Sequence, residues 1–140
     1  MEAVEGKLKL GQDAPDFTAE STSGQVSLGQ YRGKWVVLFS YVKDDTSVCT
    51  AQCVSFVDHQ ETFKALGVQL LGLSVDSLES HQRWVAKLER ERGVRFGFPL
   101  VADADKKIAR LYGILDEERG MALRGGFVID PQGKLRFLAC

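Results

Sequence analysis

The stretch that decides the fold is KWVVLFSYVKDDTSVCTAQC, residues 34–53. Its first eight residues, 34–41, form a continuous apolar run whose length and Val, Phe and Tyr content favour a buried strand over a helix. From Cys49 onward, apolar residues recur at steps of three, four or seven, which is typical of one face of an amphipathic helix. This face comprises Cys49, Cys53, Phe56, Val57, Phe63 and Leu66. The stretch therefore predicts a strand that leads directly into a helix.

The next segment completes a strand–helix–strand unit. Gly67 is a typical helix stop, and residues 68–75, VQLLGLSV, form a second buried-strand run. Two strands joined by one helix in the same sheet are expected to be parallel. A second helix is predicted over residues 77–92 and is closed by Gly93.

The remaining chain predicts a mixed sheet. We expect a strand over 98–102, a helix over 104–112, a charged loop over 116–120, and strands over 126–130 and 134–138. The turn sequence Pro131-Gln132-Gly133 joins the last two strands as a hairpin. Residues 1–24 are mixed and polar, with turn residues at 21–24. The order of elements indicates an α/β fold with helices on both sides of a mixed sheet.

A sheet of this kind is expected to carry a helix on each face, and we expect a further helix after Cys140. The sequence does not contain one. Three explanations stay open: a minimal fold, a partner that covers the face, or a chain that is a fragment of a longer protein.

Length, charge and cysteine count narrow the class of protein. The 140 residues fit one domain, 1–140, and the net charge of −1 gives no reason to expect nucleic-acid binding. No apolar run approaches the ~18 residues of a membrane span, and the N-terminus does not resemble a secretory signal. Three cysteines, an odd number, argue against a secreted disulfide framework. We therefore expect a cytoplasmic protein that binds neither nucleic acid nor membrane.

Cys49 is the candidate reactive residue. Thr46 or Ser47 can cap the predicted helix, which places Cys49 in its first turn. Unpaired N–H groups and the positive end of the helix dipole stabilise a thiolate there, and the thiolate is the nucleophilic form of cysteine. The alternative is a buried cysteine that only fills apolar space. The position at a strand-to-helix turn favours the reactive thiol.

Several motifs resemble those of the peroxiredoxins, in the alkyl hydroperoxide reductase/thiol-specific antioxidant group. The family's active-site motif is Pro-x-x-x-Thr-x-x-Cys after a strand, and Thr46 and Cys49 fit it behind Phe39-Ser40-Tyr41. Further matching segments are residues 11–17 (GQDAPDF), 73–77 (LSVDS) with His81 and Trp84, 98–103 (FPLVAD), Tyr112-Gly113, and 120–130 (GMALRGGFVID). The resemblance covers residues 7–138, and the set is far more specific than any one motif.

The resemblance implies a thioredoxin-like fold and a thiol-dependent peroxidase without metal or organic cofactor. Cys49 would attack a hydroperoxide and become a sulfenic acid. Thr46 would offer its hydroxyl to the thiolate and the peroxide, and Arg124 would stabilise the thiolate and the separating oxygens. Tyr41, Val42 and Gln52 would line the substrate pocket. A thioredoxin-like protein or another thiol would act as reductant, and a homodimer or larger homo-oligomer is expected.

The motif is degenerate at three positions. Val42 stands where the family has proline, and it keeps apolar bulk but loses the fixed φ. Asp45 replaces a common aromatic residue, and with Asp44 it would raise the pKa of a nearby thiol. Gln52 replaces a common glutamate. These departures keep a second hypothesis open, a non-catalytic peroxiredoxin-like sensor or binding module. A third is a thiol–disulfide oxidoreductase, although such proteins usually carry Cys-x-x-Cys.

Which thiol resolves the sulfenic acid also stays open. Cys53 lies four residues after Cys49 on the same helical face, so it can be a core residue or a resolving cysteine. A disulfide between these positions has poor geometry unless the first turn unwinds. One family branch pairs cysteines in a similar segment, with a spacing one residue longer. Cys140 is a less favoured partner, and the third option is direct reduction by an outside thiol.

Other candidate residues favour structural roles. His59 and His81 lack metal-ligand spacing with the two cysteines, so no zinc site is predicted. His59 is expected on a helix surface, and Trp84 in the core or an interface.

Overall fold

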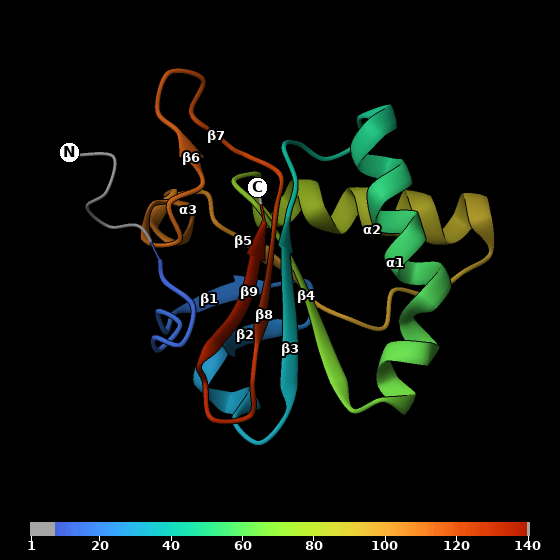
Figure 1. The fold of residues 1–140 in the computed structure, drawn as a ribbon. Helices are drawn as coiled ribbons and strands as arrows, with labels where there is room; N and C mark the ends of the chain where they lie inside the picture. Colours follow the sequence, from blue (N-terminus) through green and yellow to red (C-terminus); the bar gives the residue numbers. More distant parts are fainter. Residues whose placement is uncertain (1–7, 140) are drawn as a thin grey trace.

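The computed structural model describes residues 8–139 and contains a seven-stranded mixed sheet flanked by helices (Figure 1). Within these residues the strand order is β2-β1-β5-β4-β3-β8-β9. The strands of this sheet are β1 (Thr18–Ser21), β2 (Gly24–Ser27), β3 (Trp35–Ser40), β4 (Val68–Ser74), β5 (Leu100–Ala102), β8 (Gly125–Ile129) and β9 (Leu135–Ala139). The helices are η2 (Leu28–Tyr31), α1 (Ser47–Ala65), α2 (Leu78–Arg92) and α3 (Lys107–Leu111).

The strand–helix–strand unit predicted from the opening stretch is present. Strands β3 and β4 are parallel, with Leu38 opposite Leu71, and α1 connects them. Strand β8 lies antiparallel on the other side of β3, with Ser40 opposite Gly125. The residue after β3 and the residue before β8 therefore lie at the same edge of the sheet.

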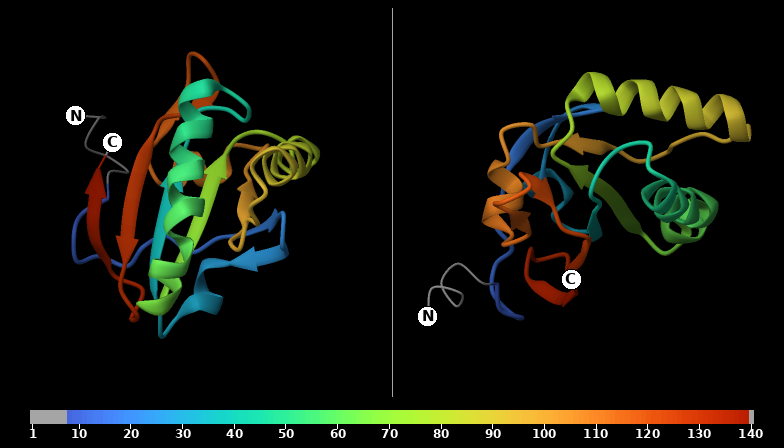
Figure 2. Two further views of the ribbon diagram at one scale, coloured as in Figure 1. Left: turned by 90° about the vertical axis from the view of Figure 1, so that its right-hand side faces the viewer. Right: turned by 90° about the horizontal axis from the view of Figure 1, so that it is seen from above.

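The sheet separates two apolar cores because successive side chains of a strand point to opposite faces. Leu38 of β3 contributes to a core that includes α3, whereas Phe39 contributes to a core that includes α1 and α2. Figure 2 shows α1 and α2 together on one side of the sheet and α3 on the other. This α/β arrangement agrees with the thioredoxin-like fold that the family resemblance implies.

A glycine in β4 allows the second core to close. A Cβ at Gly72 would lie 2.6 Å from Leu100 Cδ2 and 2.9 Å from Phe39 Cζ. Both distances are shorter than real carbon contacts, so a larger residue would force these side chains apart. The freed space lets Phe39 stack on Phe56 of α1 at a ring-centroid distance of 4.1 Å.

Several element predictions need correction. The charged loop predicted over 116–120 is the turn of a small hairpin, formed by β6 (Leu115–Asp116) and β7 (Met121–Ala122). The polar N-terminal region contains the β1–β2 hairpin, which pairs with β5 through Ser21 and Val101. The predicted helix over 104–112 and strand over 98–102 are shorter than expected. Leu66 follows the last residue of α1 and is exposed rather than part of its apolar face.

The described residues contain no helix long and apolar enough to cross a membrane. Cys140 lies outside the described residues.

Candidate active site

Thr46 and Cys49 form the start of α1. Of the two possible caps, Thr46 is the N-cap, with extended φ and ψ of −95° and 156°, and its Oγ1 accepts a hydrogen bond from the Cys49 main-chain N–H at 3.2 Å. Cys49 therefore lies in the first turn of a 19-residue helix, where the helix dipole favours a negative charge. The residue is 1% exposed.

The surroundings of Cys49 lower the pKa of its thiol. Burial alone would raise this pKa, but four neighbouring groups outweigh burial. The Thr46 hydroxyl and the main-chain N–H groups of Lys43 and Val42 act by hydrogen bonding, and Arg124 acts through its positive charge. The pairing of β3 with β8 brings Arg124 to this part of the molecule. Arg124 directly precedes Gly125, which pairs with Ser40 at the end of β3. The site therefore favours the nucleophilic thiolate.

The pKa of Cys49 is lowered even though Asp45, which was expected to raise it, lies four residues earlier in the chain. Asp45 adopts a φ of +61°, and its carboxylate accepts hydrogen bonds from Lys87 Nζ at 3.0 and 3.1 Å. Lys87 belongs to α2, and its positive charge offsets the negative charge of Asp45. Asp45 and Asp44 are not among the main groups that act on the Cys49 pKa.

The three residues predicted to line the pocket differ in burial and in hydrogen bonding. Gln52 donates a hydrogen bond from Nε2 to the Ser40 carbonyl at 3.3 Å, while its buried Oε1 has no hydrogen-bond partner among the described residues. Val42 is partly buried against the core that contains Cys49. Tyr41 is fully buried, and its hydroxyl donates a hydrogen bond to Asp44 Oδ1 at 2.8 Å. It therefore stabilises the loop between β3 and α1.

Cys53 lies one turn further along α1 and is 0% exposed. Burial, followed by the neighbouring charges of Cys49 and Asp44, raises the pKa of its thiol far above the ordinary value. Cys49 and Cys53 are both free thiols on a continuous helix. The two residues therefore differ sharply in chemistry, because Cys49 favours the thiolate and Cys53 the neutral thiol.

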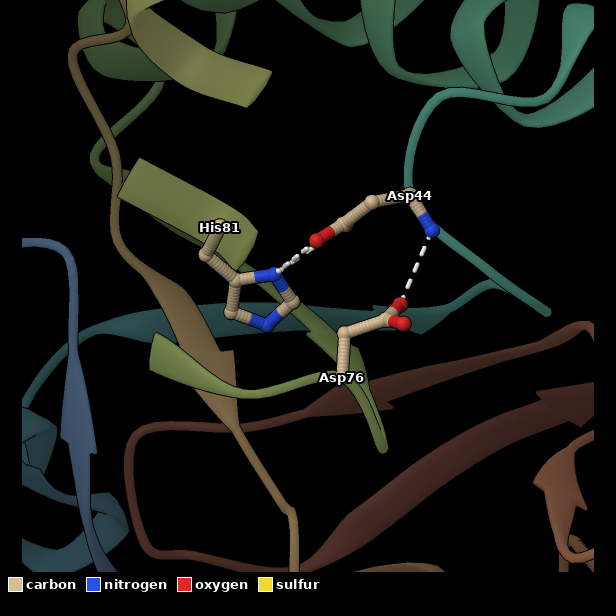
Figure 3. Close-up of side chains that lie close together, drawn as sticks. All are labelled: Asp44, Asp76 and His81. Atoms are coloured by element: carbon tan, nitrogen blue, oxygen red, sulfur yellow. Dashed lines mark hydrogen bonds and ion pairs between the residues drawn. The ribbon is translucent and has the colours of Figure 1, made fainter. Parts of the chain in front are cut away.

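A buried polar cluster behind the loop was not predicted from the sequence. Asp44, Asp76 and His81 lie together below the loop that leads into α1 (Figure 3). Asp44 follows β3 and Asp76 follows β4, so the carboxyl ends of two adjacent parallel strands bring them together. The predicted parallel pairing of these two strands was the feature of the sequence that could have indicated this cluster. Hydrogen bonds already engage the oxygens and nitrogens that could reach an ion, as described below.

His59 and Trp84 occupy the positions expected of them. His59 lies on the exposed side of α1, with Nδ1 2.8 Å from the Ser55 carbonyl oxygen. Trp84 is buried in the core beside Tyr41, at a ring-centroid distance of 5.4 Å.

Comparison with known proteins places this site in a family. The model of the AhpC/TSA family matches residues 10–138. The chain belongs to the AhpC/TSA family. This match includes β1 to β8 and all but the last residue of β9.

Relatives in the AhpC/TSA family come from archaea, bacteria and mammals. The chain is 46% identical over 129 residues to "Peroxiredoxin 2" of Thermoplasma acidophilum, which covers 92% of this chain and 65% of the relative. It is 42% identical over 136 residues to "Peroxiredoxin-2" of Mus musculus, which covers 94% of this chain and 69% of the relative. This chain thus spans less than two thirds of the length of the Thermoplasma protein.

A solved structure supports the same assignment of fold. The structure of a yeast mitochondrial 1-Cys peroxiredoxin superposes with a TM-score of 0.85 at 34% sequence identity, and the match covers 94% of this chain and 67% of the yeast chain. That work describes how the thiol of the yeast protein is resolved by the glutathione and thioredoxin systems.

One departure from the AhpC/TSA motif has a chemical consequence. The motif has proline where this chain has Val42, and proline has no main-chain N–H. The N–H of Val42 is one of the groups that lower the pKa of Cys49. The substitution therefore adds a hydrogen-bond donor next to the thiol.

Proposed function

We propose that the protein is a thiol-dependent peroxidase that reduces hydrogen peroxide or alkyl hydroperoxides through Cys49. The observation that carries this proposal is the position of Cys49 in the first turn of α1, where Thr46 caps the helix and accepts the Cys49 N–H. The lowered pKa of Cys49, to which Thr46, two main-chain N–H groups and Arg124 contribute, agrees with it. Membership of the AhpC/TSA family supports it. The chemistry needs no metal or organic cofactor.

The first step forms a sulfur–oxygen bond. The Cys49 thiolate attacks one peroxide oxygen, the O–O bond breaks, and the leaving oxygen takes a proton to become water or an alcohol. Cys49 becomes a sulfenic acid. The Thr46 hydroxyl orients the peroxide, and Arg124 and the main-chain donors stabilise charge on the separating oxygens.

A thiol reductant completes the cycle. An outside thiol condenses with the sulfenic acid to give a mixed disulfide and water, and a second thiol then releases Cys49 as a thiol. The yeast relative, whose thiol is resolved by glutathione and thioredoxin systems, supports this class of reductant. We also propose a cytoplasmic homodimer or larger homo-oligomer.

Cys53 is the alternative resolving thiol. Its place one turn from Cys49 on the same helix favours this role, because unwinding of the first turn would bring the two sulfurs together. The sulfenic acid and the Cys53 thiol would then give a disulfide and water. Its complete burial and raised pKa favour reduction by an outside thiol.

A turnover assay tests the proposal. The wild type, Cys49→Ser and Cys53→Ser proteins are supplied with hydrogen peroxide or an alkyl hydroperoxide and a dithiol reductant, and peroxide consumption is measured. Wild type and Cys53→Ser should consume peroxide, and Cys49→Ser should not. Loss of turnover in Cys53→Ser as well as in Cys49→Ser would assign the resolving role to Cys53. Reduction of a protein disulfide without peroxide consumption would point instead to a thiol–disulfide oxidoreductase.

A further inference from the structure

The loop between β3 and α1 is tied to Cys49 at its end, because the Oγ1 of Thr46 accepts a hydrogen bond from the Cys49 main-chain N–H at 3.2 Å. The main-chain N–H groups of Val42 and Lys43, earlier in the same loop, help to lower the pKa of the Cys49 thiol. Main-chain donors can stabilise a thiolate only if the loop holds them in place, because a mobile loop would turn them to water. Within this loop, Asp44 is 6% exposed, whereas Lys43 and Asp45 on either side are exposed. The buried carboxylate of Asp44 is therefore the attachment point of the loop.

Asp44 is held from several elements at once. Its main-chain N–H donates to Asp76 Oδ2 at 2.8 Å, after the end of β4. Its Oδ1 accepts from the Tyr41 hydroxyl at 2.8 Å, and its Oδ2 accepts from the Ser80 hydroxyl at 2.7 Å. The fourth contact is with His81 of α2, whose Nδ1 lies 2.8 Å from Oδ2. Figure 3 shows the imidazole of His81 facing the Asp44 carboxylate.

The position of His81 requires a proton between the ring and Asp44. His81 is 0% exposed, and its Nε2 lies 2.9 Å from the Val101 carbonyl oxygen. A carbonyl oxygen only accepts, so Nε2 carries a hydrogen, and Nδ1 also faces an acceptor. One proton therefore lies between Nδ1 and the Asp44 carboxyl group. This proton prevents repulsion between the buried carboxylate and the Nδ1 lone pair.

The other titratable groups around the pair leave it as the charged contact at the base of the loop. Burial, and then the Asp44 charge, raises the pKa of Tyr41, so its phenol stays neutral. The thiol of Cys53 is neutral for similar reasons. Asp76 carries the second carboxylate of the cluster. Its Oδ2 accepts hydrogen bonds from the Ser74 hydroxyl at 2.7 Å and from the Asp44 main-chain N–H. Breaking the pair would leave a buried charge without its partner.

We propose that the Asp44–His81 pair is the positioning element that holds the N–H groups of Val42 and Lys43 toward the Cys49 sulfur. His81 fixes Asp44 from α2, Asp44 fixes the loop, and the loop presents its two donors to the thiolate. The pair does not touch substrate. This role deepens the proposed peroxidase function and, for its effect on catalysis, rests on it.

The test measures the Cys49 thiolate separately from the peroxidase reaction. The rate of alkylation of Cys49 is followed against pH by mass spectrometry of its peptide, and the reaction with hydrogen peroxide is measured in parallel. The variants are Asp44→Ala, Asp44→Asn and Ser80→Ala. Asp45→Asn is the control for loss of a carboxylate charge in the loop, because it removes that charge at the exposed neighbour, where asparagine tolerates the positive φ. Circular dichroism checks that each variant is folded.

Asp44→Ala is expected to move the midpoint of the alkylation profile upward by about one pH unit, which leaves about tenfold less thiolate below the pKa. Asp44→Asn should restore most of the wild-type profile, because its amide N–H can donate to the Nδ1 of neutral His81 while its oxygen accepts from Tyr41. Ser80→Ala removes one contact and should give a smaller upward shift. Asp45→Asn should match the wild type.

An unchanged profile in folded Asp44→Ala would overturn the proposal, as would an equal shift in Asp45→Asn. If Asp44→Ala does not fold, the test rests on Ser80→Ala. An unchanged alkylation profile of Cys49 in Ser80→Ala would then overturn the proposal. If the profiles shift as expected but the wild type does not react with peroxide, the positioning role stands and the proposed peroxidase function fails.

Discussion

The Oγ1 of Thr46 lies 3.2 Å from the main-chain nitrogen of Cys49 and accepts its hydrogen bond. One hydroxyl thus caps α1, fixes the first-turn position of the nucleophile and lowers its pKa. The stability of the first turn of α1 and the reactivity of Cys49 therefore depend on the same oxygen atom.

Replacing this hydroxyl should affect stability and reactivity together. Thr46→Val keeps the shape of the side chain but removes the cap, so the free energy of unfolding should fall by about 1 kcal/mol. The pKa of Cys49 should rise because a hydrogen bond to the thiolate is lost. Denaturant unfolding and the pH profile of Cys49 alkylation check the two effects. Thr46→Ser keeps the hydroxyl and should resemble the wild type, and equal losses in both variants would contradict this account.

Arg124 should act on the peroxide reaction with little effect on stability. Arg124→Gln removes the positive charge near Cys49, so the pKa of the thiol should rise and the rate of peroxide reaction should fall by about 100-fold. Stopped-flow measurement of sulfenic acid formation checks this prediction. Arg119→Gln is the control, because that side chain is exposed and contacts Asp116 on the β6–β7 hairpin. A rate that falls equally in both variants would argue against a specific role for Arg124.

Val42→Pro should restore the family motif while removing a donor. Proline has no main-chain N–H, so the pKa of Cys49 should be higher in Val42→Pro than in Val42→Ala, which keeps the N–H. The pH dependence of Cys49 alkylation compares the two variants. The same midpoint in both would show that the Val42 N–H does not act on the thiolate.

Cys53 should make the fold sensitive to alkaline pH. Its folded pKa is raised above the ordinary value of 9.0, so the folded protein keeps the thiol neutral while the unfolded chain ionises it. Stability linked to this group is fully present below about pH 9 and declines as the pH rises above it. Tyr41 acts in the same direction above pH 10.0, its ordinary pKa.

Denaturant unfolding below and above pH 9 tests the role of Cys53. Cys53→Ala should lower the stability at neutral pH, because it leaves a small cavity, but should lose less stability than the wild type on moving to alkaline pH. The same alkaline loss in both proteins would show that Cys53 does not contribute to it.

Periodicity was enough to predict β3, α1, β4 and α2, because long apolar patterns and glycine stops mark buried elements. It failed for β6 and β7, since two-residue strands carry no period, and for the polar β1–β2 hairpin at the sheet edge. Sequence alone could not show which of Asp44 and Asp45 is buried. The positive φ at Asp45 turns the two carboxylates toward different partners, His81 and Lys87.

The site could be predicted in part for similar reasons. A cysteine in the first turn of a helix is a local feature, so Cys49 could be inferred from spacing, whereas its cap stayed open between Thr46 and Ser47 until the structure showed Thr46. Arg124 came only from family resemblance, because its effect on Cys49 depends on the antiparallel register of β3 and β8. His81 contacts Asp44 across 37 positions of sequence, and no local pattern marks such a pair.

Trapping the first intermediate tests the central claim most directly. The protein is treated with one equivalent of hydrogen peroxide in the presence of a sulfenic-acid trap, then digested, and the peptides with Cys49 and Cys53 are mapped by mass spectrometry. The account predicts the trapped adduct on Cys49 in the wild type and its absence in Cys49→Ser. Unmodified Cys49 after peroxide treatment, or an adduct on Cys53 instead, would contradict it.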